Sequence, residues 1–284
     1  MRCIVFGATG YLGSKLVQSL TAQGDAVLCV VRKQSSLSRL EAVRDKVRFC
    51  EMENLPEVLS GGEAYDCMVN LACRYPRNSG SDGDMFEANF YQPLRVFLAC
   101  RDSGVKKYVT IGTGLPDTLN AYAMSKAQFA QVLGWYADQC RQKGTPITVC
   151  NVELENFYGE DEPTDRFLPG TVAKLKKNEK ILLTAGTQVR DFVYVEDVLS
   201  NLMRVIRADG LPEYLDLPLG SGEGVSIREL ITYLKELLGS ESQLCFGAVP
   251  SRMNEPDSVA DKQKMEHYGL TVRYGWKEGM RKFL

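Results

Sequence analysis

Short apolar runs alternate with amphipathic stretches through the first half of the chain, and this alternation constrains the fold more than any other feature. The runs are rich in β-branched residues and lack a strict apolar–polar alternation, which is typical of strands buried on both faces. Strands that alternate with helices predict an α/β fold with a parallel, doubly wound sheet. The expected strands are 2–6, 26–31, 47–50, 67–72, 108–112 and 147–152.

Three longer stretches between these strands have the periodicity of amphipathic helices, and each ends at a glycine that can stop a helix. They cover residues 11–24, 86–104 and 122–144. The family resemblance described below implies dimers that form through two long helices, so segments 90–100 and 130–140 of the second and third stretches could be part of a homodimer interface. Their apolar stripes would equally suit packing against the sheet alone.

The sequence pattern changes near residue 156, where loop-forming and charged residues become more frequent. A further strand and helix follow near 189–206, and the tail from about 213 is rich in Gly and Pro. Because no clean linker separates the two patterns, we expect two interleaved domains. The first should comprise 1–155 and about 187–212, and the smaller second domain 156–186 and 213–284.

Three glycines, Gly7, Gly10 and Gly13, directly follow the first expected strand and open the first helix. A dinucleotide diphosphate needs a tight turn, a backbone that it can approach without meeting Cβ atoms, and a helix N-terminus aimed at it. Glycines can also mark ordinary turns, but at this junction they favour a dinucleotide site on a Rossmann-type sheet. The residues expected to line it are Gly7, Thr9, Gly10, Tyr11, Leu12 and Gly13.

The end of the second strand should lie near the adenosine ribose, where an acidic residue typically accepts hydrogen bonds from the hydroxyls of NAD. This chain instead has Arg32 and Lys33 beside Ser35 and Ser36. Cations and hydroxyls suit a 2′-phosphate, so the sequence favours NADPH over NAD(H). The alternative is a solvated basic turn in which Arg32 at most stacks on adenine.

Tyr122 and Lys126 are four residues apart in an expected helix, so they share one face. An ammonium close to a phenol favours the phenolate and should lower the pKa of the tyrosine. Such a pair can pass a proton to or from a carbonyl while hydride moves. The alternative is a tyrosine packed on the core with its lysine in water.

Cysteine and charge usage exclude several other classes. The nine cysteines are scattered without a CxxC pair, and His267 is the single histidine, so no metal site is expected. Free thiols within apolar runs suit a reducing compartment. A net charge of −2 argues against nucleic acid or an anionic membrane surface as a partner. With no signal peptide and no apolar stretch near 20 residues, we expect a cytoplasmic protein.

These motifs together resemble the extended short-chain dehydrogenases/reductases, in particular the nucleotide-sugar epimerase/dehydratase family. The resemblance spans essentially the whole chain. It is carried by "GATGYLG", "NLA" (70–72), Asn89 in "FEANF", Thr113, "YAMSK", "NFYG" (156–159), "RDFVYVEDV" (190–198) and "SIREL" (226–230).

The resemblance implies roles for the residues at these positions. Thr113, with Thr110 as a substitute, would hydrogen-bond the reacting oxygen. Tyr122 would be the general acid/base, and Lys126 would tune it and bind the ribose of the cofactor. Asn89 would lie near the catalytic lysine. Leu71 and Ala72 would join Arg32 and Asn89 on the cofactor side.

The resemblance also implies a nucleoside-diphosphate sugar as substrate, held by the smaller domain. Asn156 would lie near the sugar diphosphate, and the guanidinium fork of Arg190 suits a phosphate. The alternative for Arg190 is an ion pair with Asp191 or Asp197. Further candidates are Arg252 and, after the fourth strand, Arg74, Tyr75 and Arg77, which could meet the sugar or merely decorate a loop.

Departures from the family pattern narrow the reaction. Dehydratases of the family usually carry an Asp–Glu pair after the threonine, whereas here Gly114 and Leu115 follow it. Epimerase/reductases that resemble GDP-fucose synthase recruit a cysteine and a histidine, and His267 is too late in the chain for that role. Glu153 stands where many relatives have Arg, which weakens any substrate contact copied from distant members.

Net reduction and 4-epimerisation remain. The epimerases share the Thr–Tyr–Lys set but hold NAD tightly, which suits an acidic second-strand end better than Arg32 and Lys33. The tail and "LTAGTQVRDFVYVEDV" most resemble the nucleotide-sugar 4-ketoreductases that include CDP-abequose synthase, which act in deoxysugar biosynthesis. A dinucleotide-sensing scaffold without catalysis is a third alternative, and the intact Thr–Tyr–Lys set disfavours it.

Overall fold

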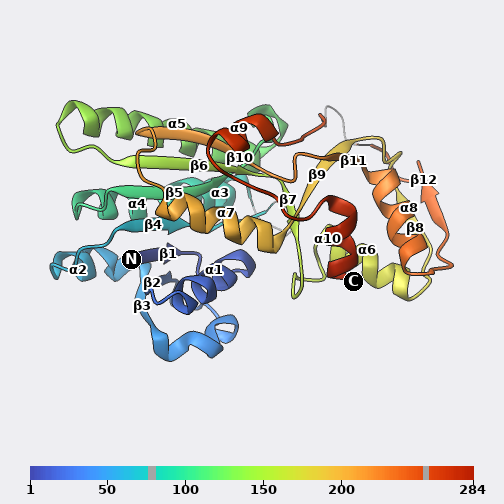
Figure 1. The fold of residues 1–284 in the computed structure, drawn as a ribbon, viewed down its shortest axis with the longest axis horizontal. Helices are drawn as coiled ribbons and strands as arrows, with labels where there is room; N and C mark the ends of the chain where they lie inside the picture. Colours follow the sequence, from blue (N-terminus) through green and yellow to red (C-terminus); the bar gives the residue numbers. More distant parts are fainter. Residues whose placement is uncertain (76–80, 252–255) are drawn as a thin grey trace. The chain divides into compact units, whose positions relative to one another are not determined.

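The computed structural model describes residues 1–75, 81–251 and 256–284. The chain forms two compact units, Met1–Glu153 with Leu199–Leu217, and Leu154–Val198 with Pro218–Leu284 (Figure 1). The segment that returns to the first unit therefore runs from 199 to 217, where the sequence suggested about 187–212. Each unit is described separately below.

A seven-stranded sheet forms the centre of the first unit, with strand order β10-β6-β5-β4-β1-β2-β3. The six strands from β3 to β6 pair in parallel with their neighbours. The predicted α/β fold with a parallel, doubly wound sheet is therefore confirmed. The bounds are β1 Arg2–Phe6, β2 Ala26–Val31, β3 Val47–Glu51, β4 Cys67–Asn70, β5 Lys107–Gly112, β6 Thr148–Leu154 and β10 Tyr214–Leu219.

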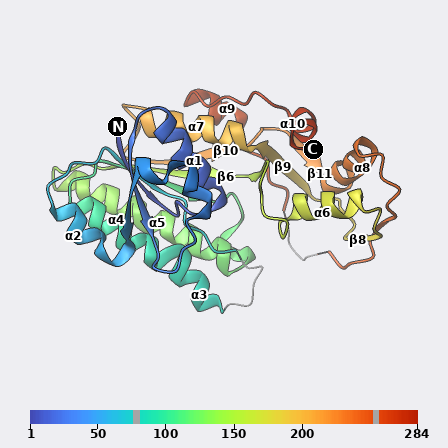
Figure 2. The same ribbon diagram turned by 90° about the horizontal axis from the view of Figure 1, so that it is seen from below.

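Helices cover both faces of this sheet (Figure 2). One face carries α1 (Tyr11–Ala22) and α7 (Val195–Arg207), and the other carries α2 (Leu55–Ser60), α4 (Gln92–Asp102) and α5 (Ala121–Gln142). Chain order reverses between β1 and β4, and ligands of such sheets bind outside the carboxyl ends of the strands at this switch point. The loops that follow β1, β4 and β5 meet at that edge.

The helix expected over 86–104 is interrupted. α3 (Asp82–Phe86) continues into a π-helical turn at Glu87–Tyr91 before α4 begins. A 3₁₀ segment, η1 (Ser38–Lys46), and the short α2 were not expected from periodicity. Two further 3₁₀ turns are η2 (Met52–Asn54) and η4 (Asp117–Leu119). Within the described ranges, no helix combines the length and apolar content needed to cross a bilayer.

Aromatic packing holds α5 on the sheet. Tyr108 of β5 lies between Phe97 of α4 and Phe129 of α5, with ring centroids 4.9 and 6.5 Å away in edge-to-face geometry. All three side chains are buried, and each such pair contributes about 0.5–1.5 kcal/mol beyond its buried area. The first turns of α5, which carry Tyr122 and Lys126, are thereby fixed relative to the end of β5.

Most cysteines are part of this core. Seven of the nine are buried, all nine lie within the described residues, and none forms a disulfide. Burial raises the pKa of Cys3 and Cys150 to about 11, so these thiols stay neutral and pack as small apolar groups.

The second unit contains a three-stranded sheet, β11-β9-β7, and a two-stranded sheet, β12-β8. Asp191 of β9 is fully buried, and its carboxylate accepts hydrogen bonds from the backbone N–H groups of Ser221, Gly222 and Ala260 at 2.7, 2.9 and 3.2 Å. This carboxylate ties three segments together. The strands are β7 Asn156–Tyr158, β8 Ile181–Leu183, β9 Val189–Tyr194, β11 Gly224–Ser226 and β12 Leu244–Phe246; the helices are α6 Phe167–Lys176, α8 Ile227–Leu237, α9 Lys262–His267 and α10 Trp276–Phe283.

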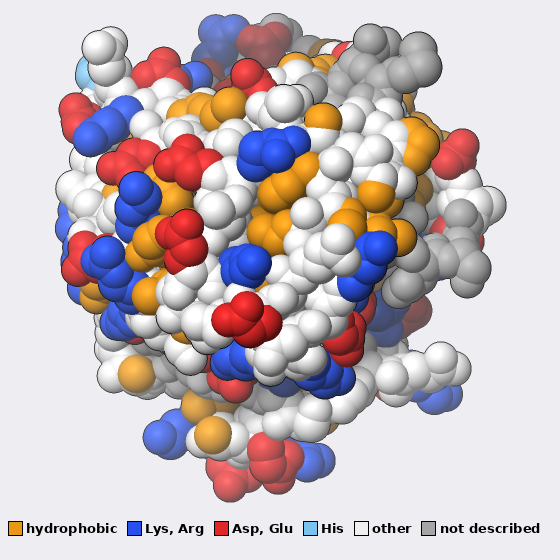
Figure 3. Space-filling model, turned by 90° about the vertical axis from the view of Figure 1, so that its right-hand side faces the viewer, with side chains coloured by type: hydrophobic (Ala, Val, Ile, Leu, Met, Phe, Trp, Pro, Cys, Tyr) orange, Lys and Arg blue, Asp and Glu red, His pale blue; other side chains and the backbone are white. Residues whose placement is uncertain are grey.

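Charges of both signs are interspersed on the face drawn in Figure 3, and the described residues there form no large patch of a single sign. This distribution agrees with the net charge of −2. It offers no local field for a polyanionic partner on that face.

Candidate active site

The glycine-rich loop after β1 is too tightly packed for side chains at two positions. Gly7 has φ +84°, and a Cβ atom there would lie 2.4 Å from the backbone nitrogen of Ala72. A Cβ on Gly13 would lie 2.1 Å from the carbonyl oxygen of Gly7. Leu71 donates its N–H to Phe6 at 2.8 Å, so the loop after β4 is held against the glycines.

Gly10 has a different environment. Its missing Cβ would meet Gly7 alone, at 3.3 Å, and the residue is exposed. Gly10 is the N-cap of α1, and this helix end has neither a side-chain cap nor an acidic residue in its first turn. The positive end of the helix dipole is therefore accessible at Gly10, and such a helix end fits the binding of a dinucleotide diphosphate.

The neighbouring loop residues frame this helix end. Thr9 is half-buried, Tyr11 and Leu12 are buried, and the ammonium of Lys15 lies 5.3 Å from the ring centre of Tyr11. A ligand could therefore reach the side chain of Thr9 and the backbone of Gly10, whereas Tyr11 and Leu12 could meet it mainly through their backbone.

The turn after β2 presents two exposed cations, Arg32 and Lys33. Ser35 closes the turn, because its hydroxyl accepts from the Arg32 N–H at 3.2 Å and its own N–H donates to the Arg32 carbonyl at 2.9 Å. Within the described part of the chain, neither cation has an ion-pair partner. They are therefore available to an anionic group.

Thr113 and Tyr122 meet at the carboxyl end of β5. Thr113 interacts with Tyr122 and lowers the pKa of its hydroxyl. Asn120 caps α5 by accepting the Ala123 N–H at 2.9 Å, which fixes the first turn of the helix. The alternative threonine, Thr110, is buried and accepts a hydrogen bond from Asn70 at 3.0 Å. Thr113 therefore accompanies the tyrosine, and Thr110 does not.

Lys126 follows one helical turn later, and its Nζ donates to the carbonyl of Ile111 at 2.9 Å. Burial lowers the pKa of Lys126. Burial also raises the pKa of Tyr122 well above its ordinary value near 10, and Cys73 and Tyr75 raise it further, against a smaller lowering by Thr113. The expected acidification of the phenol by the ammonium is therefore wrong for this structure, because desolvation dominates.

Asn89 connects three elements from the π-helical turn. Its Oδ1 accepts the backbone N–H of Arg74 at 2.8 Å, and its Nδ2 donates to the Arg74 carbonyl at 3.0 Å and to the Ser125 hydroxyl at 3.4 Å. The residue is fully buried. Asn89 thus ties the loop after β4 to α5 beside Lys126, and π turns of this kind occur frequently at functional sites.

The loop after β4 contacts Tyr122 directly. The ring of Tyr75 stacks on Tyr122 with centroids 5.5 Å apart and an interplanar angle of 27°. The guanidinium of Arg74 lies 3.9 Å from Asp84 of α3. Cys73, which was not expected at the site, is an exposed residue of the same loop and is one of the groups that raise the pKa of Tyr122. The available signal was its place directly after "NLA" at the ligand-binding edge of the sheet.

The remaining expected residues lie in the second unit or outside the described residues. Asn156 begins β7. Arg190 is buried on β9, and its guanidinium donates to the carbonyls of Val189 and Pro256, both at 2.7 Å. Asp197 accepts the N–H groups of Arg273 and Tyr274 at 3.1 Å. Arg77 and Arg252 fall in 76–80 and 252–255, outside the described residues.

Two cavities of the first unit lie along different halves of α5. The one beside the N-terminal half has a volume of about 440 Å³ and is lined by Thr113, Lys126, Asn151, Glu153 and Asp216, among others. Asn151 donates to Asp216 at 2.7 Å, so Glu153 occupies a polar, partly acidic wall. Within the described residues, no group of acidic, histidine and cysteine side chains is arranged to hold a metal ion.

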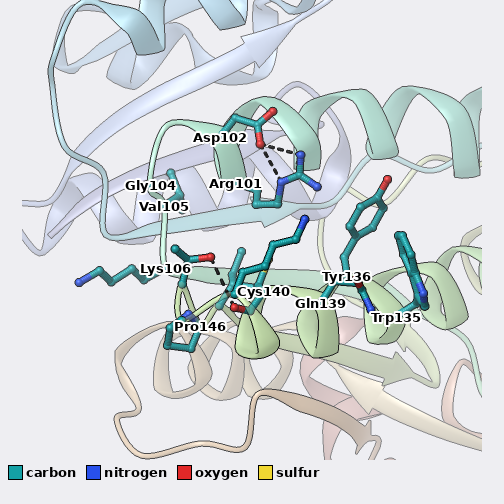
Figure 4. A pocket seen from close by; sticks show the side chains of 14 residues that line it. Arg101, Asp102, Gly104, Val105, Lys106, Trp135, Tyr136, Gln139, Cys140 and Pro146 are labelled. Atoms are coloured by element: carbon teal, nitrogen blue, oxygen red, sulfur yellow. Dashed lines mark hydrogen bonds and ion pairs between the residues drawn. The ribbon is translucent and has the colours of Figure 1, made fainter.

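The larger cavity, of about 660 Å³, lies at the far end of α4 and α5 (Figure 4). Arg101 and Asp102 of α4 form an ion pair at its rim, and Trp135, Tyr136 and Cys140 line it from α5. With a rise of about 1.5 Å per residue, Cys140 lies about 21 Å along the helix from Lys126. The larger cavity therefore lies farther along α5 than Tyr122 and Lys126.

Comparison with known proteins places these features in a family. A sequence model of the "NAD dependent epimerase/dehydratase family" matches residues 3–216. The chain belongs to this family. The matched segment includes the glycine-rich loop, Thr113 and the Tyr122–Lys126 pair, so the resemblance inferred from these motifs is confirmed.

Individual relatives cover nearly the whole chain. The chain is 27% identical to the CDP-abequose synthase of Salmonella typhimurium over 300 residues, covering 99% of this chain and 96% of that protein. It is 25% identical to the dTDP-4-dehydro-6-deoxy-D-allose reductase of Streptomyces bikiniensis over 298 residues, covering 92% and 88%. The fold is similar to that of the UDP-glucose 4-epimerase of Thermotoga maritima, with a TM-score of 0.85 at 20% identity and coverage of 100% and 97%.

Proposed function

We propose that the protein is an NADPH-dependent nucleotide-sugar 4-ketoreductase. It would reduce the C4 keto group of a nucleotide-linked 4-keto-6-deoxy sugar, in deoxysugar biosynthesis for a surface polysaccharide or glycoside. The observation that carries the proposal is the environment of Tyr122. The phenol is buried and faces Thr113, and its surroundings raise its pKa, so that it is kept in the proton-donating form that a reduction requires.

NADPH is favoured over NADH by the turn after β2. Arg32 and Lys33 are exposed there and no acidic residue stands among residues 30–36. A 2′-phosphate would meet a guanidinium fork and an ammonium, whereas the ribose hydroxyl of NAD would find no carboxylate acceptor. The glycine-rich loop and the N-terminus of α1 would hold the diphosphate through Gly10 and the backbone of Tyr11 and Leu12.

Bound NADPH supplies the hydride. Tyr122 would donate its proton to the oxygen that develops charge at C4, and Thr113 would hold the same oxygen by a hydrogen bond. Lys126 would bind the ribose of the cofactor and reprotonate the phenol, since its own pKa is lowered by burial. In the second unit, Arg190 and Asn156 would bind the sugar diphosphate.

Two of the named relatives favour net reduction, although 4-epimerases are also among the relatives and structural neighbours of this chain. One carries the name of a 4-dehydro-6-deoxy sugar reductase, and the CDP-abequose synthase matches nearly the full length of this chain. A 4-epimerase would use the same three residues. Its tightly held NAD would not need the cations after β2.

The test is the oxidation of NADPH by the purified protein with 4-keto-6-deoxy sugars linked to CDP, GDP and dTDP. We expect turnover with one of them, slower turnover with NADH, and turnover slowed by about 10²-fold or more in the Tyr122→Phe variant. Absence of NADPH oxidation with all three would overturn the proposal. Copurified NAD, with interconversion of nucleotide hexoses and no cofactor consumption, would establish the 4-epimerase instead.

A further inference from the structure

Tyr75 and Tyr122 form an aromatic contact within the candidate active site. Their ring centroids lie 5.5 Å apart with an interplanar angle of 27°, which is typical of an offset-stacked pair. Tyr122 is buried, with 9% of its surface exposed, whereas Tyr75 is half-buried. The ring of Tyr75 therefore lies over the ring of Tyr122 and separates that side of it from solvent.

The backbone directly before Tyr75 is held by a fully buried amide. Asn89 accepts the N–H of Arg74 at 2.8 Å and donates to the Arg74 carbonyl at 3.0 Å. The same amide donates to the Ser125 hydroxyl at 3.4 Å, and Ser125 donates to the carbonyl of Tyr122 at 2.8 Å. This chain of hydrogen bonds joins the loop after β4 to the first turns of α5. The position of Tyr75 beside Tyr122 is thus set by the fold and not by the stacking alone.

Tyr122 belongs to a small apolar cluster at this end of α5. Met85 of α3 is a buried member of the cluster, and Leu115 and Leu119 pack against it from the segment after β5. Burial is the largest cause that raises the pKa of Tyr122, and Tyr75 acts in the same direction. Tyr75 has the bulkiest side chain that packs on Tyr122 among the described members of this cluster, so its removal would admit water beside the phenol.

We propose that Tyr75 is a positioning residue of the active site, whose ring holds the phenol of Tyr122 in place and keeps water away from it. The inference rests on the proposed ketoreductase function and deepens it. A phenol with little water around it stays in the neutral, proton-donating form, which the reduction of a carbonyl consumes. Because the contact is made by the face of the ring, position 75 requires an aromatic ring and not its hydroxyl group.

The direct test measures access to the Tyr122 phenol and needs no turnover. Tetranitromethane nitrates tyrosines that it can reach in the phenolate form, and peptide mass spectrometry gives the rate at each position. We expect Tyr122 to react at least about three-fold faster in Tyr75→Leu than in the wild type, because better access and a larger phenolate fraction both raise the rate. Tyr75→Phe keeps the ring and should protect Tyr122 as the wild type does. Tyr91, which is 51% exposed, is the internal reference.

Tyr233→Leu is the matched control. Tyr233 is also a half-buried tyrosine that contacts an aromatic ring, that of Trp276 at 5.2 Å between centroids, but it lies in the second unit. Its loss should leave the nitration rate of Tyr122 unchanged. If Tyr122 reacts at the wild-type rate in Tyr75→Leu, or equally fast in Tyr75→Leu and Tyr75→Phe, the inference is overturned.

The same variants separate this inference from the ketoreductase function. In the reduction assay, Tyr75→Leu should lower kcat by about three-fold or more, because the phenol is held less firmly, while the Kd for NADPH stays unchanged. Tyr75→Phe should keep most of the wild-type kcat. Equal losses of kcat and of NADPH affinity in both variants would indicate a general disturbance of the loop and would overturn the positioning role. If Tyr122 becomes more reactive in Tyr75→Leu but the wild type reduces no keto sugar, the contact is retained and the ketoreductase function alone is rejected.

Discussion

Replacing Gly13 by alanine should destabilise the first unit, because the added methyl group has nowhere to go. Its Cβ would lie 2.1 Å from the carbonyl oxygen of Gly7 and 3.0 Å from Cα of Ala8, both parts of the backbone. Contacts below 3.0 Å essentially never occur, so α1 would have to move by about 1 Å from the loop. Overpacking of this kind costs about 3 kcal/mol at the upper end of its usual range.

Gly10 provides the contrast within the same motif. A methyl group there meets Gly7 alone, at 3.3 Å, and replacing an N-cap glycine by alanine costs under about 1 kcal/mol. The same methyl group points into the space from which a diphosphate would approach the start of α1. We therefore expect Gly10→Ala to fold almost normally and to bind NADPH at least about ten-fold more weakly, a loss of about 1.4 kcal/mol.

Two measurements separate these effects. The melting temperature of Gly13→Ala should be about 6–12 °C lower than that of the wild type, because a chain of this size loses about 2–4 °C per kcal/mol. Fluorescence titration with NADPH should detect the loss of affinity in Gly10→Ala. Gly134→Ala, in the middle of α5, is the control, since the added Cβ would make an ordinary contact of 3.5 Å with the ring of Tyr214. If Gly13→Ala melts like the wild type, or Gly10→Ala keeps full affinity, the packing argument is refuted.

Four further outcomes are expected. Tyr122→Phe should lower kcat for reduction by about 10²-fold or more while the Kd for NADPH stays unchanged, and a loss of both together would speak for misfolding instead. Because burial raises the pKa of Tyr122, the wild-type reduction rate should be flat through neutral pH and fall only as pH rises through that pKa, so a loss of rate near pH 7 would contradict the assignment of the acid. The double variant Arg32→Ala, Lys33→Ala should bind NADPH about ten-fold more weakly and NADH unchanged. An equal loss for both cofactors would show that these cations do not bind the 2′-phosphate. Asp191→Asn should lower the free energy of unfolding by about 3 kcal/mol, because the NH₂ group of the new amide would face backbone N–H donors. Asp45→Asn on the surface is the control and should have no effect, so equal stability of the two variants would contradict this reasoning.

Six of the seven strands of the first unit could be predicted, because their runs are apolar on both faces. The seventh, β10 (Tyr214–Leu219), was missed, because the segment after 213 was assigned to the second domain. The helix expected over 86–104 was imperfect for a specific reason. Periodicity assumes a constant residue count per turn, and the π turn at Glu87–Tyr91 breaks that count to bring Asn89 to the backbone of Arg74. That contact joins residues 15 positions apart, so no local pattern reveals it.

The site could be predicted where a motif fixes the local geometry and not where burial decides the chemistry. The spacing of Tyr122 and Lys126 placed both on α5, yet the direction of the tyrosine pKa shift depends on desolvation, which helical spacing does not encode. The choice between Thr110 and Thr113 required Asn70 of the neighbouring strand. Cys73 was not singled out from the nine cysteines, although its place directly after "NLA" was an available signal.

The π turn has a consequence for how the chain could change. A π turn is equivalent to an α-helix with one extra residue, and each residue of an α-helix advances the helix by about 100°. Deleting a single amino acid from Glu87–Tyr91 would therefore heal α3 and α4 into one regular helix, a more conventional structure. The same deletion would rotate the amide of Asn89 out of reach of Arg74, so the loop after β4 would lose this anchor. Deletion of one codon would thus give a more regular helix and at the same time remove the hydrogen bonds between Asn89 and Arg74.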